Sequence, residues 1–568
     1  MFPGPIFDSE LRATSRRPRL YASRSACGAL LLLVVGLSYR AWPQDQPMSV
    51  RQMSGFSRSM FVRLAVAQGV IVLAITPAIV ATTIAGERSR KTLDDLLASD
   101  LTSAEIVLGK LGARLALILT LLAAGLPILS LQTLLGGIAP SEAVIAFAVA
   151  ASIAIFVGGL SILTSVVARG PREAVFAAYG LAAFWLFLGP MLDGPVQASF
   201  PSLFSAIEPG VRLVNMANPL RALGPGQFEA VRMIAILTVS GSALAALAVL
   251  RLRRSASGHG EPPRTRRGRW RFFPRKEVGD DPMRWKETQV RRTAGIVGKA
   301  VRVILLLLLV GLALLTARES AESFRHTWQF HYLADDHWWM HNRFNEYIRC
   351  VGTALYLLAL LAVTATAAGA ITTEREAETW TGLIASPLAP EEILKAKRAG
   401  VYRRTRPLIA ALIVLWIVGL ISGAVHPYGF LAAVMLLPPY LSAATALGLF
   451  VSLHAPSTAR AIGVAVCLTI VLHGGYLLLC APMSPGTPVV AFGCSPLLIF
   501  LAPISPGDLR NLGSFGSQDS FYSRGGEIIF AGLLSVLAYT VLAVALNILS
   551  AVAFDSAVDR PRRPSKSS

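Results

Sequence analysis

The chain has 568 residues, of which 54% are hydrophobic and 15% are charged, and its mean hydropathy is +0.57. A globular surface needs polar groups, so this composition excludes a set of soluble domains and indicates a protein that crosses the membrane many times. The formal net charge is +20, with basic residues concentrated at both termini and in the stretch 251–302. Beside apolar segments, this basicity favours cytoplasmic retention and attraction to anionic lipid headgroups over binding of nucleic acid.

In chain order, the apolar stretches that can cross about 30 Å of hydrocarbon as helices fall into two groups of six. Before the basic stretch they are 27–41 (short), 61–86, 111–137, 142–168, 173–193 and 229–252. After it they are 299–317, 347–373, 405–425, 427–453, 460–481 and 526–553. The expected fold is all-α, a polytopic membrane protein with about 12 transmembrane helices. The positions of Lys and Arg predict that the segments 87–110 and 374–406 and both termini are cytoplasmic.

Residues 84–110 recur as residues 371–397, 287 positions later, with eleven identities and no gap. We call these two stretches the repeated segments. Each follows the second predicted span of its group of six, so the pattern indicates a tandem duplication of a six-helix unit. The expected division of the chain is 1–252 for the first unit, 253–298 for a basic cytoplasmic linker, 299–555 for the second unit and 556–568 for a basic tail.

Within the first repeated segment, the apolar residues are spaced for roughly one face of a helix. They are Leu93, Leu96, Leu97, Leu101 and Ile106. Thr102 and Glu105 have the spacing of a capping box, and Pro390 in the second copy suits the first position of a helix. The pattern predicts a short amphipathic helix, a turn and a helix that leads into the next span. Such a segment docks in the groove of a partner or lies among the lipid headgroups, and the pattern favours neither.

The repeated segments resemble the signature that follows the second span of ABC-2-type transporter permeases. Ser386-Pro387-Leu388, followed by Glu392, Ile393 and Lys397, meets that signature closely, whereas the first copy has Asp100 where the family favours Pro. The run Asp281-Pro-Met-Arg-Trp-Lys-Glu287 is similar to the motif that precedes the first span in such permeases, with Asp281 in place of Asn. Asn218-Pro219-Leu220 is also similar to a family motif. The resemblance extends over about residues 20–555.

The resemblance implies an exporter of the cell membrane, in which two six-helix units face one another and a separate ABC ATPase subunit binds beneath them. The repeated segments would then be coupling helices in the ATPase cleft. The residues implied in coupling are Glu87, Arg88, Thr92, Leu96, Glu105, Lys110, Glu374, Arg375, Thr379, Leu383, Glu392 and Lys397. The chain itself would bind no cofactor, and ATP would act through the partner subunit. One chain holds both units, so a monomer or a homodimer fits this scheme.

Two other classes of function compete with this interpretation. An ion-coupled secondary transporter needs ionisable groups inside the bilayer, and His473 is the clear exception in nearly uncharged spans. No Gly-x-x-x-x-Gly-Lys-Ser/Thr motif occurs, and Gly295–Ala300 has the wrong spacing for one. A hydrolytic membrane enzyme is also disfavoured, because neither His-Glu-x-x-His nor Gly-x-Ser-x-Gly is present.

Three further features have alternative explanations. His337 and His341 share a helical face as metal ligands can, although nearby Trp, Tyr and Phe residues are also typical of an interfacial aromatic belt. Cys480 and Cys494 border a predicted outer loop, where they form a disulfide or remain unpaired thiols. Arg16 and Arg17 precede an apolar run as in a twin-arginine signal, but that run is better explained as a short first span.

Overall fold

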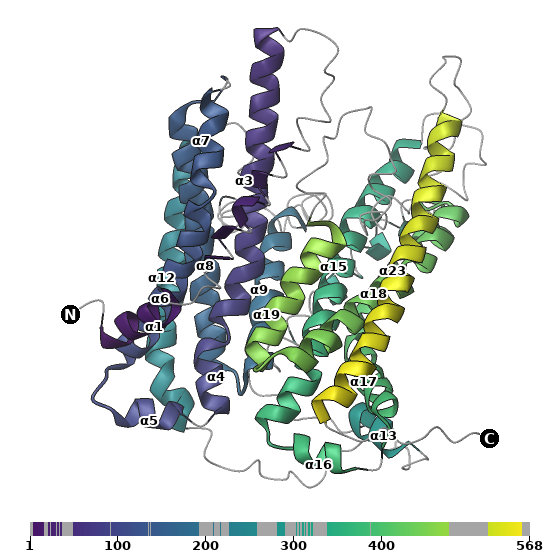
Figure 1. Cartoon of the computed structure of the whole chain (residues 1–568). Helices are drawn as coiled ribbons and strands as arrows, with labels where there is room; N and C mark the ends of the chain where they lie inside the picture. Colours follow the sequence, from purple (N-terminus) through teal and green to yellow (C-terminus); the bar gives the residue numbers. More distant parts are fainter. Residues whose placement is uncertain are drawn as a thin grey trace. The chain divides into compact units, whose positions relative to one another are not determined.

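The computed structural model of the chain describes residues 4–15, 49–90, 92–134, 138–191, 227–257, 281–289, 338–386, 388–475 and 521–558, with scattered residues between 21 and 36, between 303 and 321, and at 136, 208 and 216. The elements in these residues are all helical, as expected from the sequence. They form two compact units (Figure 1), of which the first contains α1 to α12 and the second contains α13 to α23.

The first unit is built around α8. Its helices are α1 (Pro5–Ser15), α3 (Val50–Val80), α4 (Thr83–Ser89), α5 (Leu93–Ala98), α6 (Ser103–Ala123), α7 (Leu126–Leu134), α8 (Pro140–Val167), α9 (Pro171–Met191) and α12 (Gln227–Ser257). α8 packs against α3, α6, α9 and α12, and α1 packs against α6 (Figure 1). The short α5 follows the end of α4 and precedes α6.

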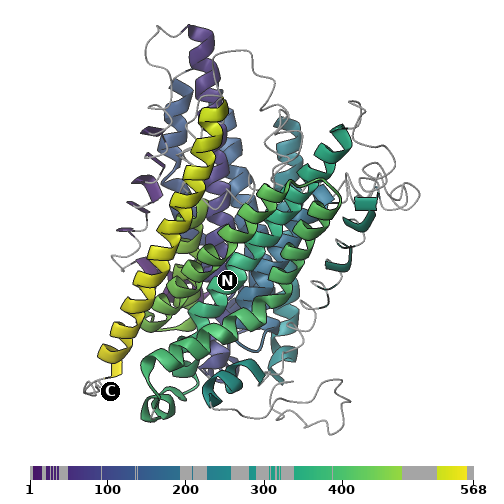
Figure 2. The same cartoon turned by 90° about the vertical axis from the view of Figure 1, so that its right-hand side faces the viewer.

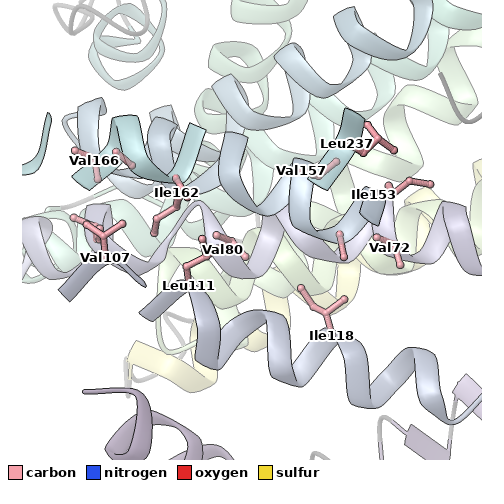
Figure 3. Packing of buried hydrophobic residues seen from close by; sticks show 14 of the residues in the cluster. Val72, Val80, Val107, Leu111, Ile118, Ile153, Val157, Ile162, Val166 and Leu237 are labelled. Atoms are coloured by element: carbon pink, nitrogen blue, oxygen red, sulfur yellow. The ribbon is translucent and has the colours of Figure 1, made fainter. Parts of the chain in front are cut away.

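The core of the first unit consists of aliphatic side chains from four helices (Figure 3). Val72 and Val80 come from α3, Ile118 from α6, Ile153 from α8 and Leu237 from α12, and all are buried. Their interdigitation positions the ends of these helices and therefore the short α5 between them.

The second unit has the corresponding order of helices, drawn mainly in green and yellow in Figure 2. They are α13 (Pro282–Gln289), α15 (Trp338–Glu376), α16 (Trp380–Ala385), α17 (Pro390–Ile421), α18 (Pro427–His454), α19 (Thr458–Ile470), a one-turn π-helix (Val471–Gly475) and α23 (Phe521–Val558). α18 packs against α15, α19 and α23, and α17 packs against α13 and α15.

Eight helices within the described residues are long and apolar enough to cross a membrane. Shorter apolar helices occur at Leu309–Arg318 and Thr458–His473, within or overlapping two further predicted spans, and α9 coincides with the span expected at 173–193. The predicted span 27–41 lies largely outside the described residues. The expected all-α membrane architecture with two repeats is confirmed.

Several helix boundaries differ from those expected. The span predicted at 111–137 begins earlier, at Ser103, because the helix restarted by Thr102 continues into the apolar stretch without a break. It is then interrupted between α6 and α7, where Gly125 lies against the Gln68 side chain with no room for a Cβ. Similarly, the span predicted at 405–425 is part of α17, which begins at Pro390 and ends at Ile421.

Candidate functional site

The two repeated segments fold in the same way. α5 and α16 each have six residues and begin 287 positions apart, at Leu93 and Trp380. Each short helix is followed by a C-cap serine, Ser99 or Ser386, whose hydroxyl donates to the carbonyl three residues earlier at 2.6 Å. α6 and α17 begin with the same spacing, as do α8 and α18. The duplication therefore keeps one spacing from α5 to the start of α8, without an insertion.

Both copies restart the next helix with an N-terminal cap. Thr102 Oγ1 accepts the N–H of Glu105 at 3.2 Å, and the Glu105 carboxylate accepts the N–H of Thr102 at 2.9 Å, so the predicted capping box is confirmed. In the second copy Pro390 occupies the first helical position, as predicted, and the Glu392 carboxylate accepts the N–H of Ala389 at 3.1 Å. These caps satisfy backbone donors that a helix start leaves unpaired.

Four charged residues and a threonine join the first repeated segment to α1. Glu87 at the end of α4 forms an ion pair with Lys110 on α6 at 3.1 Å, and the Thr92 hydroxyl donates to Glu87. Lys110 also pairs with Glu10 on α1 at 3.1 Å, and Arg114 pairs with Glu10 at 3.0 Å. One ammonium group thus connects the segment before α5, the helix after it and the amphipathic α1. We call this the first ion cluster.

The second unit contains the same arrangement, the second ion cluster. Glu374 at the end of α15 pairs with Lys397 on α17 at 2.9 Å, and the Thr379 hydroxyl donates to Glu374. Lys397 also pairs with Glu287 on α13 at 2.6 Å, and Arg404 pairs with Glu287 at 3.4 Å. Glu, Thr and Lys of the repeated segment keep the spacing of 287 between the clusters, whereas the second carboxylate and the arginine of each cluster come from positions without that spacing.

Six of the twelve predicted coupling residues therefore meet in the two ion clusters. Sequence reasoning missed the second carboxylate of each cluster, Glu10 and Glu287. Glu287 ends the Trp-Lys-Glu motif at 285–287, so a signal for it was present, whereas Glu10 lies in no such motif. The clusters differ in burial: the Glu287 and Glu374 side chains are 10% and 7% exposed, against 24% for Glu10.

A second duplicated contact lies just before each ion cluster. Ser165 Oγ on α8 accepts the N–H groups of Ile84 and Ala85, both at 3.0 Å, in the first turn of α4. Ser452 on α18, 287 positions later, accepts the two equivalent N–H groups of α15 at 3.1 and 3.2 Å. Both serines are fully buried. Each hydroxyl therefore holds the end of the second span against α8 or α18 of its own unit.

We expect Ser165→Ala to destabilise the protein by about 1–3 kcal/mol, because two buried backbone donors lose their acceptor. Ser161→Ala, one turn earlier on α8, is the matched control: Ser161 is equally buried, and its hydroxyl has no partner within the described residues. Thermal unfolding of the purified variants in detergent measures the difference. Equal effects of the two substitutions would contradict the role given to Ser165.

The two predicted arginines have different environments. Arg88 donates to the carbonyl of Val166 at 2.9 Å and to the Ser255 hydroxyl at 3.1 Å, so it joins α4 to the ends of α8 and α12. Arg375 instead lies over the Trp380 ring, 5.0 Å from its centroid, in a cation–π contact. The repeated sequence therefore keeps the charge while the contacts differ between the units.

The apolar stripe predicted for the first copy divides into two parts. Leu93 is buried in the core, and Leu97 and Leu101 pack against that core. Leu96 and its counterpart Leu383 on α16 are partly exposed. Each short helix thus offers a partly exposed leucine, which neighbours Asp94 and Asp95 on α5, whereas α16 itself has no charged residue.

The described residues bear on the other functions considered from the sequence. His473 is buried in the π-helix, with Nδ1 at 3.1 Å from the Thr469 carbonyl and Nε2 at 3.4 Å from the Tyr440 carbonyl. Within the described part of the chain, no three His, Cys, Asp or Glu side chains lie close enough to hold a metal ion. Cys27 and Cys467 are free thiols.

Several predicted features lie outside the described residues. They are the metal-ligand candidates His337 and the side chain of His341, the pair Cys480 and Cys494, and the motifs at 16–17, 218–220 and 295–300.

Comparison with known families agrees with the duplicated geometry. The family described as ABC-2 family transporter protein matches residues 6–255 and, again, residues 285–557. The chain belongs to the ABC-2 family. Each ABC-2 match begins inside an amphipathic helix, α1 or α13, and therefore includes the complete ion cluster of its unit. No curated protein matches the chain.

The family and the apolar helices together make this ABC-2 protein a multi-pass membrane protein with two tandem repeats. The second match begins at residue 285, within α13, and α13 packs against α17 of the second unit. The ABC-2 unit as it occurs here therefore includes the amphipathic helix that precedes its spans.

Proposed function

We propose that this ABC-2 protein is the membrane-spanning permease subunit of an ATP-binding-cassette exporter in the cell membrane. A separate ATPase subunit supplies ATP hydrolysis and binds α5 and α16. The observation that carries this proposal is the duplication of a short, partly exposed helix together with the ion cluster behind it. Such a pair of docking helices suits an ATPase with two equivalent binding clefts.

The contacts of the two segments suggest how movement is transmitted. α5 and α16 are short and end in tight serine turns, so a displacement of either helix moves the capped start of α6 or α17 with it. Lys110 and Lys397 connect these starts to the preceding span and to the amphipathic α1 or α13. A displacement of the short helix therefore moves the following helix, the preceding span and α1 or α13 together, because packed helices shift as rigid bodies.

Two features of the sequence support an external energy source. The chain lacks a phosphate-binding Gly-x-x-x-x-Gly-Lys-Ser/Thr motif. Its spans carry almost no ionisable side chains of the kind that bind a driving ion. ATP thus acts through the partner. Because one chain contains both units, a monomer is sufficient to form the membrane part, and a homodimer would double it.

The proposal is tested by co-purification from the native membrane. We expect an ATPase subunit to remain bound to the wild-type chain and to be lost from the Leu96→Asp/Leu383→Asp variant, because a carboxylate in a docked apolar contact loses its hydration. Mass spectrometry of the purified complex identifies and quantifies the subunit. The loss should exceed tenfold, which corresponds to about 1.4 kcal/mol.

Val50→Asp is the matched control, since Val50 is an 87% exposed apolar residue at the start of α3, far along the chain from either short helix. This variant should retain the ATPase like the wild type. If the Leu96→Asp/Leu383→Asp variant retained the ATPase, α5 and α16 would not be part of the interface. Solute movement driven by a proton gradient in the absence of any ATPase would favour the secondary transporter instead.

A further inference from the structure

One face of α17 has an exposed basic part. Lys395, Arg403 and Arg406 are exposed and, at about 100° per residue, lie within roughly 80° of one another around the helix. Lys395 is paired with Glu391 at 3.8 Å. Among the described residues, neither Arg403 nor Arg406 has an ion-pair partner. These two guanidinium groups therefore define the charge of this face, which we call the α17 face.

The neighbours of these arginines are parts of the membrane-spanning helices. Tyr402, next to Arg403, accepts a hydrogen bond from Thr445 at 3.2 Å, and Thr445 lies nine residues before the end of α18. Arg398 donates to Asn547 Oδ1 at 2.9 Å, and Asn547 belongs to the apolar stretch 532–554. The basic part of α17 thus lies beside two apolar helices of the second unit, α18 and the stretch 532–554.

The first unit has no such face in the duplicated helix. With the constant spacing of 287, the counterparts of Lys395, Arg403 and Arg406 on α6 are Leu108, Ala116 and Leu119. Leu108 and Leu119 pack against the core of their unit. The fold is compatible with apolar residues at these positions, so the arginines of the second copy are not required by helix packing.

The same face continues as exposed hydrocarbon. Beyond Arg406, the side chains of Val414, Ile417 and Ile421 are 56%, 38% and 62% exposed and fall within the same sector of α17. From Arg406 to Ile421 the helix rises about 22 Å. One leaflet of a bilayer contributes about 15 Å of hydrocarbon. A phosphate beside the arginines matches this face in charge, and acyl chains match its aliphatic part, of which Val414 and Ile417 lie about 12 Å and 16 Å beyond Arg406, the depth of one leaflet.

We propose that the α17 face binds an anionic phospholipid of the cytoplasmic leaflet as a resident ligand of the second unit. The two guanidinium groups hold the phosphodiester, and Val414 and Ile417 contact the acyl chains. Arginine suits this role because its planar fork donates two parallel hydrogen bonds to a phosphate. This inference concerns lipid binding by the permease alone and does not depend on the proposed ATPase.

The test uses the purified full chain in nanodiscs of phosphatidylcholine and phosphatidylglycerol with identical acyl chains. Native mass spectrometry measures which lipid remains bound after the protein is released from the nanodisc. We expect the wild type to retain phosphatidylglycerol in preference, and Arg403→Gln/Arg406→Gln to lower that preference about 30-fold. Arg403→Lys/Arg406→Lys should keep only part of it, because the charge remains but the fork of two parallel hydrogen bonds to the phosphate is lost.

Arg51→Gln/Arg58→Gln, which removes two exposed arginines of α3, is the matched control and should behave as the wild type. Equal retention of both lipids by the wild type overturns the proposal, as does an unchanged preference in Arg403→Gln/Arg406→Gln. Displacement of phosphatidylglycerol by inorganic phosphate also overturns it, since that result would indicate a site for small anions. If the glutamine variant fails to fold, a salt titration of the wild type decides: the preference should fall as salt rises, and a constant preference refutes the site.

Discussion

Lys397→Met is expected to destabilise the protein by about 3–5 kcal/mol, the usual cost of leaving buried carboxylates without their cation. The Lys397 side chain is 2% exposed and lies between Glu374 at 2.9 Å and Glu287 at 2.6 Å. Methionine keeps most of the volume and removes the charge. The two carboxylates would then repel one another, with Arg404 the remaining cation of the cluster. Thermal unfolding in detergent, followed by tryptophan fluorescence, measures the change.

Lys110→Met provides the comparison within the same chain. Its partners Glu10 and Glu87 are 24% and 28% exposed, so water can solvate them once the lysine is removed. We therefore expect a smaller loss, about 1.5–3 kcal/mol, as for a hydrogen bond to a charged group. Lys397→Met combined with Glu287→Gln and Glu374→Gln should recover much of the stability. Equal losses for the two lysine variants would show that burial does not govern the strength of the clusters.

The close crossing of α8 and α12 gives the second large effect, at Gly241. A Cβ on Gly241 would lie 2.7 Å from Phe156 Cα and 2.8 Å from the Ile155 carbonyl oxygen, and both atoms belong to the α8 backbone. Backbone cannot move aside as a flexible side chain can. Gly241→Ala should therefore separate the helices and cost about 3 kcal/mol, the upper end of the usual range for overpacking.

Gly69→Ala is the control for this experiment, because no atom lies within 4 Å of the added Cβ on α3. Alanine is a better helix former than glycine, so this variant should be unchanged or more stable by up to about 1 kcal/mol. The two substitutions are chemically identical and are expected to have opposite signs. A stabilised Gly241→Ala protein, measured by the same thermal unfolding, would contradict the close crossing.

The local features of the repeated segments follow from residues close together in the chain. A helix cap depends on side chains three positions apart, so the spacing of Thr102 and Glu105 is sufficient to predict the start of α6. Pro390 predicts the start of α17 in the same local way, because proline lacks the N–H that the first helical position leaves unpaired. Hydrophobic length likewise indicates the long apolar helices.

The partners of the charged residues could not be obtained in this way. Glu10 meets Lys110 across 100 positions and Glu287 meets Lys397 across 110, so neither pairing has a local pattern. Arg88 and Arg375 occupy the same place in the repeat, yet one binds backbone carbonyl groups and the other a tryptophan ring. Only the packing of α1 on α6 and of α13 on α17 decides which charges meet.

The sequence by itself determined the membrane class, the duplication and its spacing, because hydropathy and repetition are properties of composition and order, and its motifs carried the resemblance to the ABC-2 family. The tertiary structure alone decided which of the twelve candidate residues form two ion clusters, how deeply each cluster is buried and which face of α17 is exposed. Those properties depend on distances between segments remote in the chain, and such distances are set when the apolar faces of the helices pack.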